Sequence, residues 1–179
     1  MNESYYIEGC KNHDRLSQEK LYRQFYPALF ALCRTFFVDN HEIVTALNNG
    51  MMKVFKNIEQ YHADKGTFFN WVYTVVRNAA LTEVRNKKTD ALLVYTGSLP
   101  GNASFNPFEE KEWNTVYELL HKLPLTTRAV CTLYYNEGFS IKEIAASLEM
   151  KEGTVKWHLN EGRTRLKNLF TPNFNKSEG

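Results

Sequence analysis

No segment of the 179-residue sequence is apolar over the roughly 20 residues that a membrane-spanning helix needs. The first residues, Met1–Leu16, carry charged side chains such as Glu3, Glu8 and Lys11 where a secretory signal would have a continuous apolar stretch. We therefore expect a cytoplasmic location and no direct insertion into a membrane.

Cysteine is scarce, and metal or catalytic motifs are missing. The three cysteines, Cys10, Cys33 and Cys131, are odd in number and far apart, so we expect reduced thiols. The histidines lack metal-ligand spacing; they are His13, His41, His62, His121 and His158. Glycine-rich phosphate loops, nucleophile motifs and close carboxylate pairs are absent too. We expect no metal, no cofactor and no enzymatic activity.

The overall charge argues neither for nor against binding to nucleic acid. The formal net charge is only +2, so any affinity for nucleic acid must come from local clusters of cations. Hydrophobic residues make up 43% of the chain and aromatic residues 14%, which suffices for one ordinary domain or two small ones.

A first periodic block covers residues 17–88. Its first apolar residues recur three or four apart, as in an amphipathic helix: Leu21, Phe25, Leu29, Leu32, Cys33 and Phe36. Pro27 interrupts this series. Because proline costs a helix interior about 3 kcal/mol, we predict a bend or two helices meeting there.

Two more helices are predicted in this block. Asp39 and Asn40 can cap the second helix, and Thr67, after a turn at residues 64–66, can cap the third. The apolar residues expected in the second are Val44, Leu47, Met51, Met52, Phe55 and Ile58. Those expected in the third are Phe68, Trp71, Val72, Val75 and Leu81, followed by the cations Arg85, Lys87 and Lys88 at its end.

Residues 89–107 lose this periodicity and are rich in turn formers. A stretch of this kind is long for a loop inside one compact domain, so it indicates a flexible linker. We therefore predict an all-α protein with two small helical domains, residues 17–88 and 108–170, joined by the linker.

The second block begins with two predicted helices. The first carries the apolar residues Trp113, Val116, Tyr117, Leu120 and Leu123 and stops at Pro124. The second runs from Arg128 to Tyr135 and is closed by Gly138.

A helix-turn-helix follows. Ser140 and Glu143 have the spacing of a capping box, with Phe139 and Ile144 as a hydrophobic staple, so a helix is predicted to begin at Ile141. The small Ala145 would allow another helix to cross closely. After a turn at Glu149–Lys151 comes a last helix, with an apolar stripe made of Val155, Leu159, Leu166 and Leu169.

The last helix is rich in cations: Lys156, His158, Arg163, Arg165 and Lys167. A second helix placed this way enters the major groove of DNA, where cations suit phosphates and base edges. The alternative is a helical hairpin with a solvated basic face. DNA binding is favoured by four features taken together: the capping box, the staple, the small crossing residue and the cations.

The same segments resemble a known family. Leu123-Pro124, Phe139 to Ala145, Glu152 to Lys156 and Arg163 to Leu166 closely resemble the fourth region of extracytoplasmic-function bacterial sigma factors. The second region of that family is similar to Leu21 to Pro27, Asn48 to Phe55 and Phe69 to Leu81. The resemblance covers the chain from about residue 19 to residue 170, and both blocks in this order are more specific than a helix-turn-helix alone.

This resemblance implies that the first block binds the beta-prime clamp of core RNA polymerase and the single-stranded minus-ten promoter element, and that the second reads the duplex minus-thirty-five element and touches the beta flap. The implied polymerase-binding residues are Asn48, Asn49, Met52 and Phe55. Those implied for the minus-ten element are Thr74, Arg77, Asn78 and Arg85. Those implied for the minus-thirty-five element are Thr154, Lys156, Trp157, His158, Asn160, Glu161 and Arg163. An anti-sigma factor, possibly membrane-bound, is the further partner implied.

Several of these residues also have ordinary explanations. Lys156 can be a solvated lysine, Trp157 can pack against the protein instead of contacting a thymine methyl group, and Arg163 can brace its own domain through an ion pair. Asn78 is favoured as a contact to an unstacked base, because an amide can pair with a base edge.

The sequence departs from the family at seven positions. On the last helix, Trp157, His158 and Glu161 replace residues that are more often small or arginine. The other four departures lie earlier in the chain. Val44 and Thr45 stand where acidic residues are usual. Glu149 occupies a position that is usually glycine, and Lys151 occupies that of a Ser or Thr cap, whose loss costs about 1 kcal/mol.

Two other functions are compatible with the helical pattern. One is a stand-alone helix-turn-helix regulator with an N-terminal interaction domain, which would bind duplex promoter DNA without polymerase. The other is a helical adaptor that binds only protein, which would show no salt-sensitive affinity for DNA.

Overall fold

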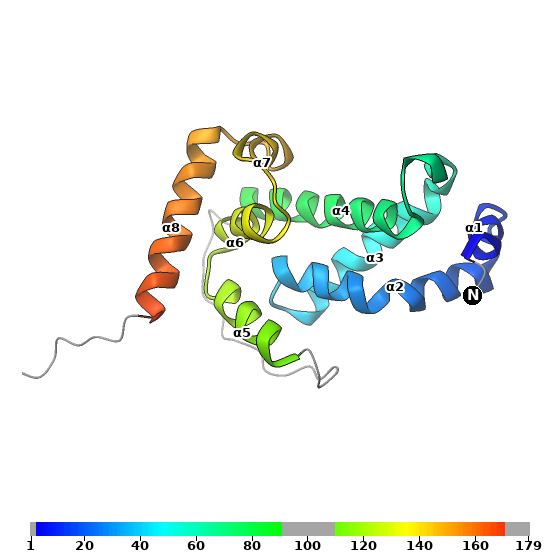
Figure 1. Cartoon of the computed structure of the whole chain (residues 1–179), viewed down its shortest axis with the longest axis horizontal. Coiled ribbons are helices and arrows are strands. Elements are labelled where there is room, and N and C mark those ends of the chain that lie inside the picture. Colours follow the sequence, from blue (N-terminus) through cyan, green and yellow to red (C-terminus); the bar gives the residue numbers. More distant parts are fainter. Residues whose placement is uncertain (1–2, 91–109, 171–179) are drawn as a thin grey trace, which may run out of the picture. The chain divides into compact units, whose positions relative to one another are not determined.

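The computed structural model describes residues 3–90 and 110–170, and the side chains among them except those of 88–90, 110–113 and 170. All regular elements in these ranges are helical (Figure 1). The chain divides into two compact units, Met1–Glu83 and Val84–Gly179, each described here by itself. The predicted linker, 89–107, lies almost entirely outside the described residues, so the predicted domain limits stay a prediction.

The first unit begins with α1 (Glu3–Lys11) and α2 (Arg15–Phe36), which pack against each other. Asp14 caps α2, since its carboxylate accepts hydrogen bonds from the backbone N–H groups of Leu16 and Ser17. The two helices meet at Gly9, where an added Cβ would lie 2.8 Å from the Cβ of Ser17. This contact requires the smallest residue.

The unit continues with α3 (Asn40–Lys56), the short 3-10 turns η1 (Ile58–Gln60) and η2 (Ala63–Lys65), and α4 (Phe68–Asp90), which runs past the unit boundary. Asp39 caps α3 by accepting from the N–H groups of His41 and Glu42. Thr67 caps α4, because its hydroxyl accepts from the N–H of Asn70 at 3.3 Å. Both predicted caps are confirmed.

The core of the first unit lies between α2, α3 and α4. All six residues of the predicted α2 stripe are buried. α3 and α4 approach closely at Gly50, where an added Cβ would lie 2.8 Å from the Cα of Val76. A side chain at position 50 would therefore separate the two helices.

The structure differs from the sequence predictions for this unit at three places. α2 is one helix through Pro27, so two helices do not meet there; the proline is exposed, away from the buried stripe. α1 was not predicted. On α3 the buried face is made by Ile43, Ala46, Leu47, Gly50, Met51 and Val54, whereas Met52 is 69% exposed.

The second unit contains α5 (Glu110–His121), α6 (Leu125–Cys131) and the π-helical turn η3 (Thr132–Asn136). The buried guanidinium of Arg128 closes the end of α5: its Nε donates to the Leu120 carbonyl at 3.0 Å and its Nη2 to the Leu123 carbonyl at 2.9 Å. A helix end leaves carbonyl groups without partners in the helix, and Arg128 supplies donors for them. The turn after η3 contains Gly138, at φ 71°.

The unit ends with α7 (Ile141–Ser147) and α8 (Glu152–Phe170), the predicted helix-turn-helix. The capping box is confirmed, since the Ser140 hydroxyl accepts from the Glu143 N–H while the Glu143 carboxylate accepts from the Ser140 N–H at 2.8 Å. α8 buries Val155 and Leu159 as predicted, but Leu169 is 47% exposed, and Gly162 is the buried residue one turn beyond Leu159.

Candidate nucleic-acid interface

α8 is fixed to α6 at a close crossing centred on Gly162. A Cβ added at Gly162 would lie 2.5 Å from the Sγ of Cys131 and 3.3 Å from the Cγ2 of Thr127. One turn earlier, Nδ1 of His158 shares a hydrogen bond of 2.9 Å with the hydroxyl of Thr127, which is 2% exposed. These contacts set both the distance and the rotation of α8 about its axis.

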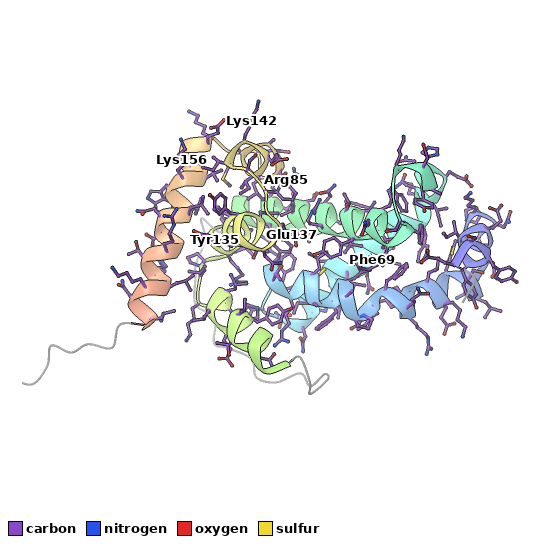
Figure 2. All side chains as sticks on the ribbon, viewed as in Figure 1. Phe69, Arg85, Tyr135, Glu137, Lys142 and Lys156 are labelled. Carbon is purple, nitrogen blue, oxygen red and sulfur yellow. The ribbon has the colours of Figure 1, made fainter. Side chains whose placement is uncertain are left out.

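This rotation determines which face of α8 is open. Residues three and four apart lie on one face of a helix. Opposite the buried Val155, Leu159 and Gly162, the exposed face comprises Gly153, Lys156, Trp157, Asn160, Arg163, Thr164 and Lys167. Figure 2 shows Lys156 on the half of α8 that is nearer α7. The face combines cations, an amide and a 58% exposed indole, which are groups that contact phosphates and base edges.

The remaining residues predicted for this site lie elsewhere on α8. His158 is half-buried and bonded to Thr127, which favours a packing role over DNA contact. Glu161 is half-buried and forms an ion pair with Arg165, so its negative charge is balanced within the helix. Thr154 is half-buried in the first turn, where its N–H donates to the Lys151 carbonyl at 2.9 Å.

The turn before α8 departs from ideal cap chemistry, as the sequence suggested. Glu149 has the left-handed value φ 49°, where glycine is the usual residue. The N–H of Met150 donates to the Ala145 carbonyl at 2.9 Å, which completes the C-terminal cap of α7. Lys151 precedes α8 and has no side-chain oxygen to accept from the first N–H groups.

A shallow hollow lies between α7 and the start of α8, and the two lysines that line it are exposed. Its lining residues are Lys142, Ala145, Ala146, Glu149, Met150, Lys151, Glu152 and Thr154. Figure 2 labels Lys142 at the start of α7. The sequence analysis does not assign Lys142 or Lys151 to this surface, although both are cations of the helix-turn-helix.

In the first unit, α4 presents a second candidate surface. Asn70, Thr74 and Asn78 recur every four residues and are exposed, with the half-buried Thr82 next in the series. The hydroxyls of Thr74 and Thr82 donate to the carbonyls of Asn70 and Asn78 at 2.9 and 3.0 Å. This leaves two exposed amide side chains on an uncharged stripe, a surface suited to base edges rather than to phosphates.

The two arginines predicted for the minus-ten element are less open. Arg77 and Arg85 are both half-buried. The Arg85 guanidinium, which the boundary places with the second unit, donates to the Ser147 carbonyl at 3.2 Å and lies 3.0 Å from the Glu149 carboxylate. Its own-chain contacts therefore compete with any contact to DNA.

The residues predicted to bind polymerase divide between two faces of α3. Asn48 and Met52 are exposed, Phe55 is half-buried, and the Tyr22 hydroxyl donates to the Asn48 side-chain oxygen at 2.7 Å. Asn49 points to α4 instead, where its amide donates to the Glu83 carboxylate at 3.2 Å. The structure therefore gives Asn49 a role in joining α3 to α4.

Within residues 3–90 and 110–170, His, Cys, Asp and Glu side chains form no group of three that could hold a metal ion. The three thiols are buried, and burial raises the pKa of Cys10 and Cys131 to about 11 and that of Cys33 to about 12. In the same described ranges no helix has both the length and the hydropathy of a membrane span.

Two protein-family models match the chain. The model described as "Sigma-70 region 2" matches residues 21–89, and "Sigma-70, region 4" matches residues 113–166. The two matches follow the order of the two candidate surfaces along the chain.

Known proteins of similar sequence carry related names. The chain is 26% identical over 164 residues to the ECF RNA polymerase sigma factor SigE of Mycolicibacterium smegmatis, covering 86% of this chain but only 62% of that longer relative. It is also 26% identical over 177 residues to the ECF sigma factor SigW of Bacillus subtilis, covering 90% of this chain and 92% of that one.

A solved structure shares the fold. The sigma factor RpoE of Bartonella quintana, crystallised with the anti-sigma factor NepR, is similar with a TM-score of 0.51 and 17% sequence identity. The match covers 88% of this chain and 98% of that one.

Proposed function

This chain belongs to the sigma-70 family, in the extracytoplasmic-function class of RNA polymerase sigma factors, and we propose that it brings core polymerase to promoters through the two surfaces described above. The exposed face of α8 contacts the duplex minus-thirty-five element. The amide stripe of α4 contacts the single-stranded minus-ten element. The observation that carries this proposal is the locked rotation of α8, which turns Lys156, Trp157 and Asn160 outward together.

The partners follow from the same assignment. Core RNA polymerase binds the Asn48 and Met52 face of α3 through its beta-prime clamp and the second unit through its beta flap. An anti-sigma factor is a further proposed partner, since the sigma factor of similar fold was crystallised with one. Members of this family are initiation factors, so polymerase makes the RNA and the chain needs no catalytic group. A cytoplasmic location follows, because transcription takes place there.

Run-off transcription with core polymerase tests the proposal and separates its two halves. The wild-type chain should make transcription start at a selected promoter, and neither core polymerase nor the chain should do so alone. A regulator that acts without polymerase would instead bind the duplex promoter by itself with full affinity. Such a result would contradict the proposed function.

Lys156→Ala and Asn78→Ala should fail at different steps. Lys156→Ala should weaken promoter binding by about 1–3 kcal/mol if the lysine reads a base edge, and by less if it touches only phosphate. Asn78→Ala should impair opening of the minus-ten duplex, because its base contacts form only after unstacking, which costs a few kcal/mol. The measurement is transcript yield on a matched template and on one already mismatched across the minus-ten element.

The pre-melted template should restore much of the yield of Asn78→Ala and far less of that of Lys156→Ala. Lys20→Ala is the matched control, since Lys20 is an exposed lysine on α2, a helix that contributes no residue to either surface. It should behave as wild type on both templates. Equal rescue of both site variants would contradict the division of labour between α4 and α8.

A further inference from the structure

Trp157 is an unusual residue to leave on the open face of α8. Its side chain is 58% exposed, although an indole is one of the largest apolar groups in proteins. A single exposed apolar side chain needs no explanation by itself. Here, however, the indole lies on the same helical face as Lys156, Asn160 and Arg163, so its surroundings are polar and cationic.

The indole is also supported from behind. The rings of Trp157 and His158 are 4.9 Å apart between centroids and meet edge to face at 77°. His158 is in turn bonded to the buried Thr127 of α6 at 2.9 Å. The chain of contacts from Thr127 through His158 to Trp157 restricts the indole, while the Gly162 crossing prevents α8 from turning.

An indole whose orientation is restricted on this face can contact an apolar group in the major groove of duplex DNA. The faces of stacked bases are covered, and the major groove offers hydrogen-bonding groups at most positions. Its apolar group is the C5-methyl of thymine. A lysine or an amide recognises the polar base edges, whereas an indole has its best contact with that methyl.

We propose that Trp157 reads the C5-methyl group of a thymine in the minus-thirty-five element and that His158 is the positioning residue that holds the indole for this contact. The inference rests on the proposed function and narrows it to one chemical group. Asn160 lies three residues further on, about 4.5 Å along the helix axis. Base pairs are spaced by about 3.4 Å, so the thymine should lie one or two base pairs from the base that Asn160 contacts.

Replacing thymine by deoxyuridine tests this directly, because it removes the methyl group and keeps every hydrogen-bonding group. The preferred element is first selected by the full-length chain with core polymerase from duplexes randomised across the minus-thirty-five region. Each thymine of the selected duplex is then replaced singly by deoxyuridine. The dissociation constant of each substituted duplex is compared with that of the thymine duplex. Loss of one buried methyl corresponds to about a fourfold weaker binding.

The wild-type chain should show this fourfold ratio at one thymine. Trp157→Ala should bind the thymine and deoxyuridine duplexes equally. His158→Asn, which keeps a polar group near Thr127 but lacks the ring, should lower the ratio toward one without unfolding. Melting followed by circular dichroism verifies that the variants are folded. Because the ratio compares two duplexes with the same protein, a general loss of affinity does not change it.

Two controls make the test specific. Leu169→Ala removes another exposed apolar side chain of α8, 47% exposed, and should keep the fourfold ratio. Asn160→Ala should lose affinity and keep the ratio. A wild-type complex that selects an element but shows a ratio of one at every thymine overturns the inference, as does a Trp157→Ala variant that retains the ratio. Failure of the proposed function is distinct, since no element would then be selected and no polymerase-dependent transcript would be made.

Discussion

The two helices of the helix-turn-helix are held in place by different means. α7 is specified at its own ends, by the reciprocal Ser140–Glu143 capping box at its start and the Met150–Ala145 hydrogen bond at its finish. α8 begins after Lys151, which has no capping oxygen, and follows a turn in which Glu149 takes a left-handed conformation. Local chemistry therefore favours α7 far more than the start of α8.

α8 gains its position from tertiary contacts instead. Gly162 lets Thr127 and Cys131 approach its backbone, and His158 is bonded to Thr127. The difference teaches how the site is arranged: α7 and α6 supply a rigid frame, and α8 is docked by one face. Its other face, which includes the exposed Gly153 of its first turn, is open to a partner. Substitutions in the caps of α7 should leave the contacts between α6 and α8 intact, and substitutions in those contacts should leave the caps intact.

The largest effect is expected at the docking face. Gly162→Val should destabilise the protein by about 1–3 kcal/mol, because its Cβ would lie 2.5 Å from the Cys131 Sγ and the tightly packed helices must separate. Thermal or urea unfolding followed by circular dichroism measures the change. Promoter binding should fall too, since the rotation of α8 is no longer fixed.

The same change at the other glycine of α8 is the control. A Cβ at Gly153 would meet nothing within 4 Å, so Gly153→Val should leave the free energy of unfolding nearly unchanged. Equal destabilisation by the two substitutions would mean that the α6–α8 crossing does not support α8 in the way described.

A smaller and opposite pair of effects is expected at the two helix starts. Ser140→Ala should lower stability by about 1 kcal/mol, because it removes an acceptor for the Glu143 N–H. Lys151→Ser should raise stability by about 1 kcal/mol, because it supplies the acceptor that α8 lacks. Urea unfolding of both variants measures the contrast. A gain at position 151 as small as experimental error would show that the start of α8 is already satisfied.

The capping box also carries a pH dependence of known sign. The hydrogen bonds from Ser140 lower the pKa of Glu143 below its ordinary value of 4.5. A lowered pKa in the folded state stabilises the protein above that ordinary value, and this contribution is lost as the pH falls through the folded pKa. The acid side of the stability profile should therefore be shallower in Ser140→Ala than in the wild type.

This contrast also explains what sequence reasoning could predict. The caps at Asp39, Thr67 and Ser140 were found correctly, because each depends on residues within one turn of the chain. The buried stripe of α2 was also correct, since it depends on a simple period. These are the features for which local sequence determines the structure.

The features that the sequence does not show are those that depend on distant partners. His158 reads as one cation among several, and only Thr127, 31 residues earlier, shows that it faces inward. Asn49 was expected to bind polymerase, whereas Glu83 on α4 accepts its hydrogen bond. The packing of α1 against α2 depends on Gly9, and that of α8 against α6 depends on Gly162; a glycine carries no chemical group from which the sequence could predict either contact.

The smallest change in stability is expected at Gly153, and it tests whether the first turn of α8 contacts DNA through its backbone. Gly153 is exposed, its φ is not in the left-handed region, and no neighbour excludes a side chain there. Glycine in a helix costs about 0.5–1 kcal/mol relative to alanine, and less near a terminus. Gly153→Ala should therefore stabilise the protein by at most about 0.5 kcal/mol.

If the fold does not require glycine at position 153, a requirement can come only from what approaches the helix. The first N–H groups of a helix attract phosphate, and a Cβ among them would hinder close approach of the DNA backbone. Gly153→Ala should thus melt at the same or a higher temperature and yet bind the promoter several-fold more weakly, with the same loss on every minus-thirty-five sequence. Binding as tight as wild type would instead leave the DNA contacts of α8 to its side chains, beginning at Lys156.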